Sequence, residues 1–119
     1  DEMNVNEKIR TLEDVTGYPV RPDIYTGGED KYITFTYEDE RPALVADNDE
    51  TAETAYLQVT LYTPEDFNYF SDKKKIKKHL KEQGFNVESI QSWLDDAKTG
   101  TKKTRHTVFI VNITEAVED

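Results

Sequence analysis

The sequence predicts one α+β domain in which two helices pack on one face of a largely antiparallel sheet of about four to six strands. Apolar residues recur at helical spacing in two segments, near 5–12 and 76–80. β-branched and aromatic residues with a period of two fill 31–37, 55–63 and 105–114, as expected of strands. The predicted order is helix, short strand, strand, acidic segment, strand, helix and closing hairpin.

The first helix is expected at residues 4–14. Asn4 and Glu7 have the spacing of a capping box, in which each side chain satisfies a backbone amide of the first turn. Gly17, followed by Tyr18 and a proline, ends the helix. The residues predicted to form its buried face are Val5, Ile9 and Leu12.

Three segments then favour extended structure. Residues 20–25 predict a short edge strand, because Pro19 and Pro22 each remove a backbone donor from the ladder. "KYITFTY" at 31–37 and "AYLQVTLYT" at 55–63 each place apolar side chains on one face and mainly threonine, tyrosine or glutamine on the other. The apolar residues expected to share the core face are Ile33, Phe35, Tyr37, Leu57, Val59 and Leu61.

An acidic, irregular stretch, 38–54, separates these strands. It fits either a long hairpin with its own strand or a loop that orders only against a partner. A lysine-rich helix follows, with Ser71 as the expected N-cap and Gly84 just past its C-terminus. Its inward residues are Ile76 and Leu80, one turn apart.

A hairpin closes the predicted fold. Its strands are 87–94 and 105–114, joined by a loop at 95–103. The second strand has apolar residues on both faces, which is typical of a strand with neighbours on both sides. The acidic tail 115–119 is expected to fray.

The composition disfavours or excludes several classes of function and site. The 119 residues suit a single domain over 1–119, and Met3 is the expected natural start. With 25 acidic and 15 basic residues the net charge is −10, which disfavours general binding to nucleic acids. The absence of cysteine excludes disulfides and thiolate metal sites, and no apolar run approaches the roughly 20 residues of a membrane helix.

No catalytic or ligand motif is apparent. His79 and His106 have no cysteine or patterned carboxylate at metal-ligand spacing. No serine lies in a strand–elbow–helix sequence, and Gly27-Gly28 lack the remainder of a phosphate-binding loop. The acidic residues 47–53 lack the glycine of a calcium loop. We therefore expect no enzyme activity, no cofactor and no metal.

The lysine-rich helix stands out against this acidic background. Its six lysines lie between Ser71 and Gly84. Three interpretations are open: a solvated face, a contact with the acidic segment of another subunit, or a nucleic-acid site. The last would favour arginine and interleaved aromatic residues, which the helix lacks.

The segments "VNEKIRTLED", "DKYITFTYEDERPALVADND", "AYLQVTLYTPEDFNY" and "RHTVFIVNI", with the basic helix between the last two, cover most of the chain. Together they resemble the small tail-completion, or tail-terminator, proteins of long-tailed bacteriophages and prophages of Gram-positive bacteria. The resemblance implies an α+β subunit that forms a ring, commonly a hexamer, on the head-facing end of the tail tube. Its implied partners are other copies, the tail tube protein and the head connector protein, with DNA only as passing cargo in the lumen.

The resemblance also implies a place in the virion tail, after assembly in the bacterial cytoplasm. The alternatives are a head–tail connector protein, an acidic inhibitor or DNA mimic, and a nucleic-acid module that uses the lysine helix. From the charge pattern we infer two complementary patches for contacts between subunits. The residues of these patches are Lys74, Lys75, Lys78 and Lys81 on the helix, and Asp47, Asp49, Glu50 and Glu53 on the acidic segment.

Overall fold

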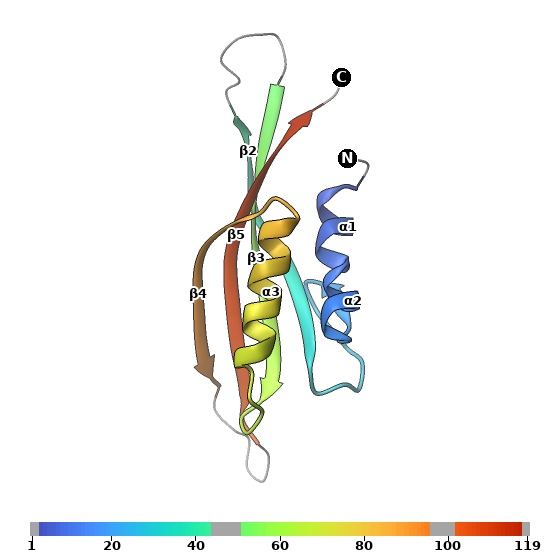
Figure 1. Ribbon diagram of the computed structural model, residues 1–119, viewed down its shortest axis with the longest axis vertical. Helices are drawn as coiled ribbons and strands as arrows, with labels where there is room; N and C mark the ends of the chain where they lie inside the picture. The colour runs from blue at the N-terminus through green and yellow to red at the C-terminus, as the bar shows by residue number, and fades with distance from the viewer. Residues whose placement is uncertain (1–2, 44–50, 96–101, 118–119) are drawn as a thin grey trace.

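The computed structural model describes residues 3–43, 51–95 and 102–117. The described elements confirm the α+β class, with the helices on one face of a mixed sheet (Figure 1). In chain order they are α1 (Val5–Arg10), α2 (Leu12–Thr16), β1 (Val20–Pro22), β2 (Tyr32–Ala43), β3 (Thr51–Pro64), α3 (Phe70–Glu82), β4 (Asn86–Leu94) and β5 (Thr104–Val117).

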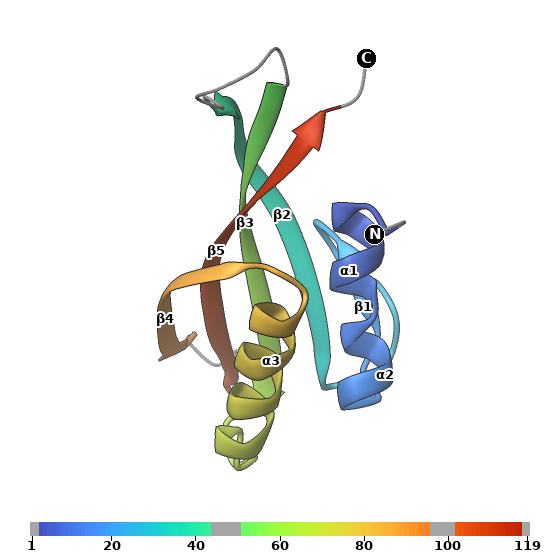
Figure 2. The same cartoon turned by 45° about the horizontal axis from the view of Figure 1, so that its top comes forward.

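The strands form a five-stranded sheet in the order β1-β2-β3-β5-β4. β1 pairs parallel with β2, whereas the other neighbouring pairs are antiparallel. The expected short edge strand and closing hairpin are therefore both present. In Figure 2, α1 and α2 lie over the β2 side of the sheet and α3 lies over the β4–β5 side.

The core lies between the helices and the sheet. The predicted alternation is confirmed in β3, where Leu57, Val59 and Leu61 are all fully buried. β2 agrees with the prediction at Ile33 and Phe35. Tyr37, which was also expected on the core face, is instead 38% exposed, because β2 leaves the core there and the Tyr37 hydroxyl donates to Asn6 at 2.7 Å. The helices and the turn after α3 contribute Ile9, Leu12, Ile76, Leu80 and Phe85, and β5 contributes Phe109, Val111 and Ile113.

The expected first helix is interrupted. Asn4 caps it as predicted, accepting a hydrogen bond of 2.9 Å from the amide of Glu7. At Thr11 the side-chain hydroxyl donates to the carbonyl of Lys8 (2.6 Å) and also contacts His79 Nε2 at 2.6 Å. Because such local bonds compete with regular helical pairing, the helix is divided there into α1 and α2.

The acidic stretch forms part of a long hairpin, the first of its two predicted alternatives. β2 continues to Ala43 and pairs with β3 from Ala52 onward, while residues 44–50 lie outside the described part of the chain. A β-bulge after Tyr37 lies at the point where β2 leaves the part of the sheet that the helices cover. We call the projecting residues 38–43, 51–54 and 114–117 the arm; it helps to make the molecule 59 Å long but only 25 by 24 Å across (Figure 1).

The ends of α3 agree only partly with the expectation. The cap position is Tyr69 rather than Ser71, because the carbonyl of Tyr69 accepts the first helical bond, from the amide of Lys73 at 2.9 Å. The amide of Phe70 donates to Asn68 Oδ1 at 3.2 Å. At the other end, Gly84 has φ +98° and its amide bonds to the carbonyl of Lys81. The amide of Phe85 bonds to the carbonyl of Leu80, which completes a Schellman motif and turns the chain into β4.

Candidate interaction surfaces

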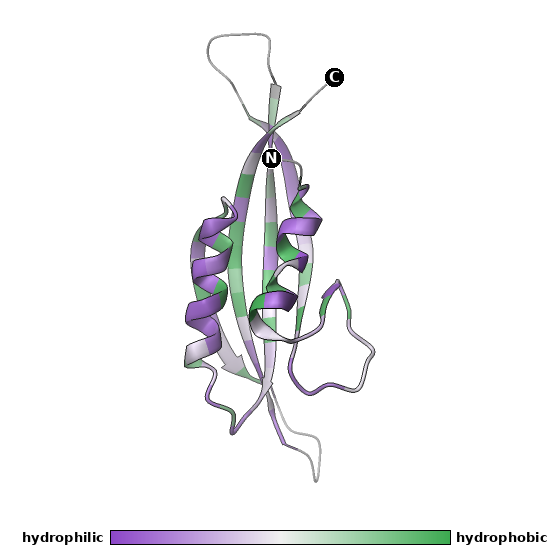
Figure 3. Cartoon of the chain, turned by 45° about the vertical axis from the view of Figure 1, so that its right-hand side comes forward, coloured by the Kyte–Doolittle hydropathy of each residue, from purple (hydrophilic) through white to green (hydrophobic). Residues whose placement is uncertain are grey.

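One face of α3 is packed in the core and the other carries the lysines. Ile76 and Leu80 are fully buried, as the spacing predicted. Figure 3 shows apolar positions on the side of the helix toward the sheet and hydrophilic positions on the outer side. We call the exposed set on that outer side the lysine face; it consists of Lys74, Lys75, Lys77, Lys78 and Lys81.

The lysine face is not neutralised within the part of the chain that the structure describes. The ion pairs among those residues use other cations, such as Lys102 with Asp66 at 2.6 Å and Arg41 with Asp39 at 2.6 Å. Clustered lysines repel one another, so a surface of opposite charge would be attracted to this face. The positive charge of the lysine face is therefore not balanced by an ion pair among the described residues.

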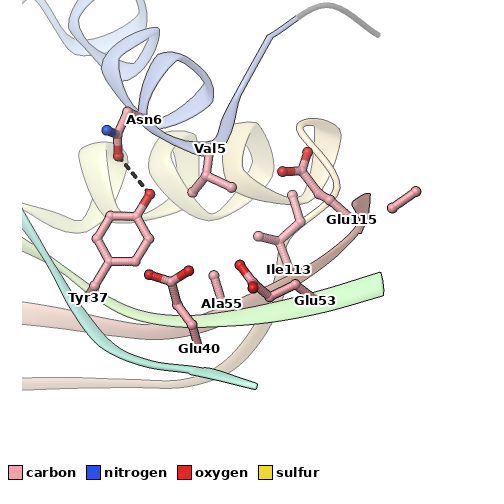
Figure 4. A pocket seen from close by; sticks show the side chains of 9 residues that line it. Val5, Asn6, Tyr37, Glu40, Glu53, Ala55, Ile113 and Glu115 are labelled. Atoms are coloured by element: carbon pink, nitrogen blue, oxygen red, sulfur yellow. Dashed lines mark hydrogen bonds between the residues drawn. The ribbon is translucent and has the colours of Figure 1, made fainter. Parts of the chain in front are cut away.

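The arm gathers acidic side chains around a groove. Glu40 from β2, Glu53 from β3 and Glu115 from β5 line a groove of about 500 Å³ that also meets the start of α1 (Figure 4). Lys8, itself buried, donates to Glu115 at 2.7 Å. Among the residues that the structure describes, neither Glu40 nor Glu53 forms an ion pair, so the outer part of the groove is acidic.

The carboxyl groups of Glu40 and Glu53, the two outer glutamates of the groove, lie close enough to interact. A hydrogen bond with the Glu53 carboxyl group, together with its charge, raises the pKa of Glu40 above the ordinary value. The folded chain therefore binds a proton at Glu40 more tightly than the unfolded chain does. It follows that this pair favours folding at low pH, and that the contribution is lost as the pH rises through the raised pKa of Glu40.

We expect Glu40→Gln to raise the melting temperature at pH 7, because a glutamine amide donates to Glu53 where two carboxylates repel. This rise in melting temperature should become smaller as the pH falls through the raised pKa of Glu40, because the wild-type Glu40 is then protonated and no longer repels Glu53. Thermal unfolding followed by circular dichroism across this range measures it. Glu29→Gln, in the loop between β1 and β2, is the matched control; equal melting temperatures for Glu40→Gln and wild type at pH 7 would contradict the prediction.

Of the residues predicted for the two patches, the structure describes the four lysines and Glu53, and it places them on different parts of the molecule. Lys74, Lys75, Lys78 and Lys81 lie on the lysine face. The arm, with the exposed Glu53, projects beyond the C-terminal end of α3 (Figure 1). The other predicted acidic residues, Asp47, Asp49 and Glu50, lie outside the described residues.

The sheet face opposite the helices carries an aromatic row that sequence reasoning missed. The β-ladder aligns Tyr32, Tyr62, His106 and Trp93 on four successive strands, and Tyr25 extends the row. The centroid separations of neighbouring rings along it are 4.6, 4.5, 4.8 and 5.4 Å. The signal was present in the alternation, since these residues fall on the non-core face, but the alignment depends on strand register.

No protein-family model matches the chain, and no match was found among curated proteins. The fold is similar to that of a solved chain described as "Virion of native gene transfer agent (GTA) particle", with a TM-score of 0.51 and 14% identity. This alignment covers 95% of this chain and 92% of that one. A second solved structure gives a TM-score of 0.47 at 13% identity, over 93% and 89% of the two chains. At such identities the likeness concerns the fold, so the tail-terminator assignment stays a prediction.

The histidines make separate local contacts. His79 touches Thr11 as described, and His106 Nε2 lies 3.0 Å from a carboxylate oxygen of Asp95. That hydrogen bond, with one from the amide of Thr104, lowers the pKa of Asp95. Among the residues the structure describes, no three histidine or acidic side chains are grouped to hold a metal ion. None of the described helices is both long and apolar enough to cross a bilayer.

Proposed function

We propose that this chain is a structural subunit of a phage-like particle that assembles with copies of itself into a ring, closes the tail tube and joins it to the head connector. The fold similarity to a chain of a gene transfer agent virion supports the coarse part of this proposal. The resemblance of the sequence segments to tail-terminator proteins supports the finer part. The role is non-enzymatic, with the protein in the virion tail and other virion proteins as its partners.

The observation that carries the proposal is the separation of charge. The lysine face and the acidic arm lie on different parts of one molecule, and no ion pair joins them among the described residues. A ring is built from heterologous contacts, in which one patch of a subunit meets a different patch of the next. The arm of one copy against the lysine face of its neighbour satisfies this requirement and fixes their register.

The overall charge suits a ring around passing DNA. A net charge of −10 for each copy leaves the molecule repelling phosphate at long range. DNA then moves through the lumen without binding tightly, provided that the lysines are occupied by neighbouring subunits. The proposal therefore uses the lysine face for protein contacts and does not require a nucleic-acid site.

The test reverses the lysine face. We expect the variant Lys74→Glu/Lys75→Glu/Lys78→Glu to stay folded, since these residues are exposed and glutamate supports helices about as well as lysine. It should lose concentration-dependent assembly in sedimentation and electron microscopy, because the arm is then repelled. The matched control is Arg10→Glu/Lys31→Glu/Lys103→Glu, which changes the net charge equally at other sites.

A charge swap distinguishes a specific contact from general repulsion. Adding Glu40→Lys and Glu53→Lys to the lysine reversal restores complementarity between arm and helix. We expect the combined variant to assemble again, whereas each half alone does not. If the lysine-reversal variant assembles like the wild type, the lysine face is only a solvated surface, and the main support for the proposal is lost.

A further inference from the structure

The two edges of the sheet are protected differently. β1 is only three residues long and ends in Pro22, and its Arg21 is held by Glu13 at 3.1 Å. β4 has nine residues and forms the other edge. After its bulge near Val87, the segment 89–94 contains no charge, proline or glycine. Proteins usually blunt an exposed edge with those features, so this segment is open to pairing with another strand.

The side chains at the end of β4 are exposed on both faces of the sheet. Trp93 is 46% exposed and Leu94 is 40% exposed, and successive residues of a strand point to opposite faces. One face of the Trp93 ring is covered by His106, with the ring planes only 9° apart. A strand added beside β4 would cover Trp93 on one face and Leu94 on the other.

The open edge is next to the lysine face. The chain passes directly from α3 through Gly84 into β4, and α3 and β4 lie side by side in Figures 1 and 2. An acidic strand that paired with β4 would therefore approach the lysines of α3. Charge complementarity therefore favours an acidic strand at the edge of β4.

We propose that the outer edge of β4 accepts a strand from the arm of a second copy of this chain. This inference rests on the proposed self-assembly, and it specifies the strand pairing by which two copies would contact each other. The arm is acidic, and within the described part of the chain its outer strands have no strand paired to their outer edges. β1 pairs with β2 only at Ile33–Phe35, and β4 pairs with β5 only as far as Asn112. The arm extends from the sheet that contains β4, along the long axis of the molecule, so the strand that reaches β4 comes from another copy (Figure 1).

Trp93 is the single tryptophan of the chain, so its fluorescence reports this edge alone. On raising the protein concentration, we expect the emission of the wild type to shift to shorter wavelength and acrylamide quenching to weaken as sedimentation shows assembly. The variant Gln91→Glu/Leu94→Glu should need a more than about tenfold higher concentration to assemble, because it would place charges in a contact with an acidic arm. Both replaced side chains are exposed.

The control is Ile24→Glu/Thr26→Glu, which replaces one apolar and one polar exposed residue in the loop after β1. We expect it to assemble like the wild type, which excludes a general effect of charge or of surface apolarity. Assembly that leaves Trp93 as accessible to acrylamide as in the monomer would overturn the inference about β4 and leave the proposed ring intact. A wild-type chain that stays monomeric at every concentration would overturn the inference and the proposed self-assembly together.

Discussion

Replacing Phe109 by alanine is expected to lower the free energy of unfolding by about 3–5 kcal/mol. Phe109 is fully buried on β5, an interior strand of the sheet. It faces Val59 of β3 on one side and Ile90 of β4 on the other. The cavity left by the ring would lie under the helices, where backbone pairing on both sides limits collapse. Urea denaturation followed by circular dichroism measures the loss.

Ile110→Ala is the matched control for this prediction. Ile110 is the next residue of the same strand, and it lies between Gln58 and Ser89 on the face opposite the helices. It is only partly buried, so we expect a loss of about 1 kcal/mol or less. Equal losses for the two variants would show that something also covers the opposite face, and they would contradict the assignment of a single core between helices and sheet.

The fold was predictable wherever a local pattern carries the information. The alternation in "AYLQVTLYT" was enough to predict a strand, and the Asn4–Glu7 spacing was enough to predict the first cap. The extension of β2 to Ala43 was left open because "EDERPA" is charged and contains proline. Those residues are extended because β3 pairs with them, and that support is not visible in their own sequence.

The candidate surfaces were predictable to a similar degree. The lysine face followed from two apolar residues one turn apart, since the helix then has only one way to point inward. The bond between Lys8 and Glu115 joins residues 107 positions apart, and the aromatic row needs the register of four strands. Such contacts depend on how the elements pack, so a single sequence without the fold does not specify them.

Two hydrogen bonds add to the burial of Ile76 and Leu80 in holding the rotation of α3, and through it the direction of the lysine face. Near its start, Asp72 is buried and accepts a bond of 2.6 Å from the Tyr18 hydroxyl. Near its end, His79 contacts Thr11 between α1 and α2 at 2.6 Å. Both partners come from the α1–β1 region, so the two contacts hold one side of the helix at two points. Loss of either hydrogen bond should allow α3 to rotate, so that the lysines no longer point in one fixed direction.

We expect Tyr18→Phe to lower the free energy of unfolding by about 1.5–3 kcal/mol, because the buried Asp72 carboxylate loses its donor. Burial, then the hydrogen bond to Asp72 and its charge, raise the pKa of Tyr18. The folded chain therefore keeps this proton more firmly than the unfolded chain. The contribution is fully present below the ordinary pKa of tyrosine and is lost as the pH rises through the raised value. Urea denaturation at neutral and alkaline pH measures both effects.

A double-mutant cycle with Asp72→Asn isolates the bond itself. Asp72 also lies in the first turn of α3, where a carboxylate is favoured by the helix dipole, so Asp72→Asn alone is expected to cost more than the coupling energy. The combined variant should be less destabilised than the sum of the two single changes. Strict additivity would mean that the Tyr18 hydroxyl and Asp72 do not act together. If the cycle shows coupling, the same single variants should also weaken assembly, because the lysine face would no longer be held in one direction.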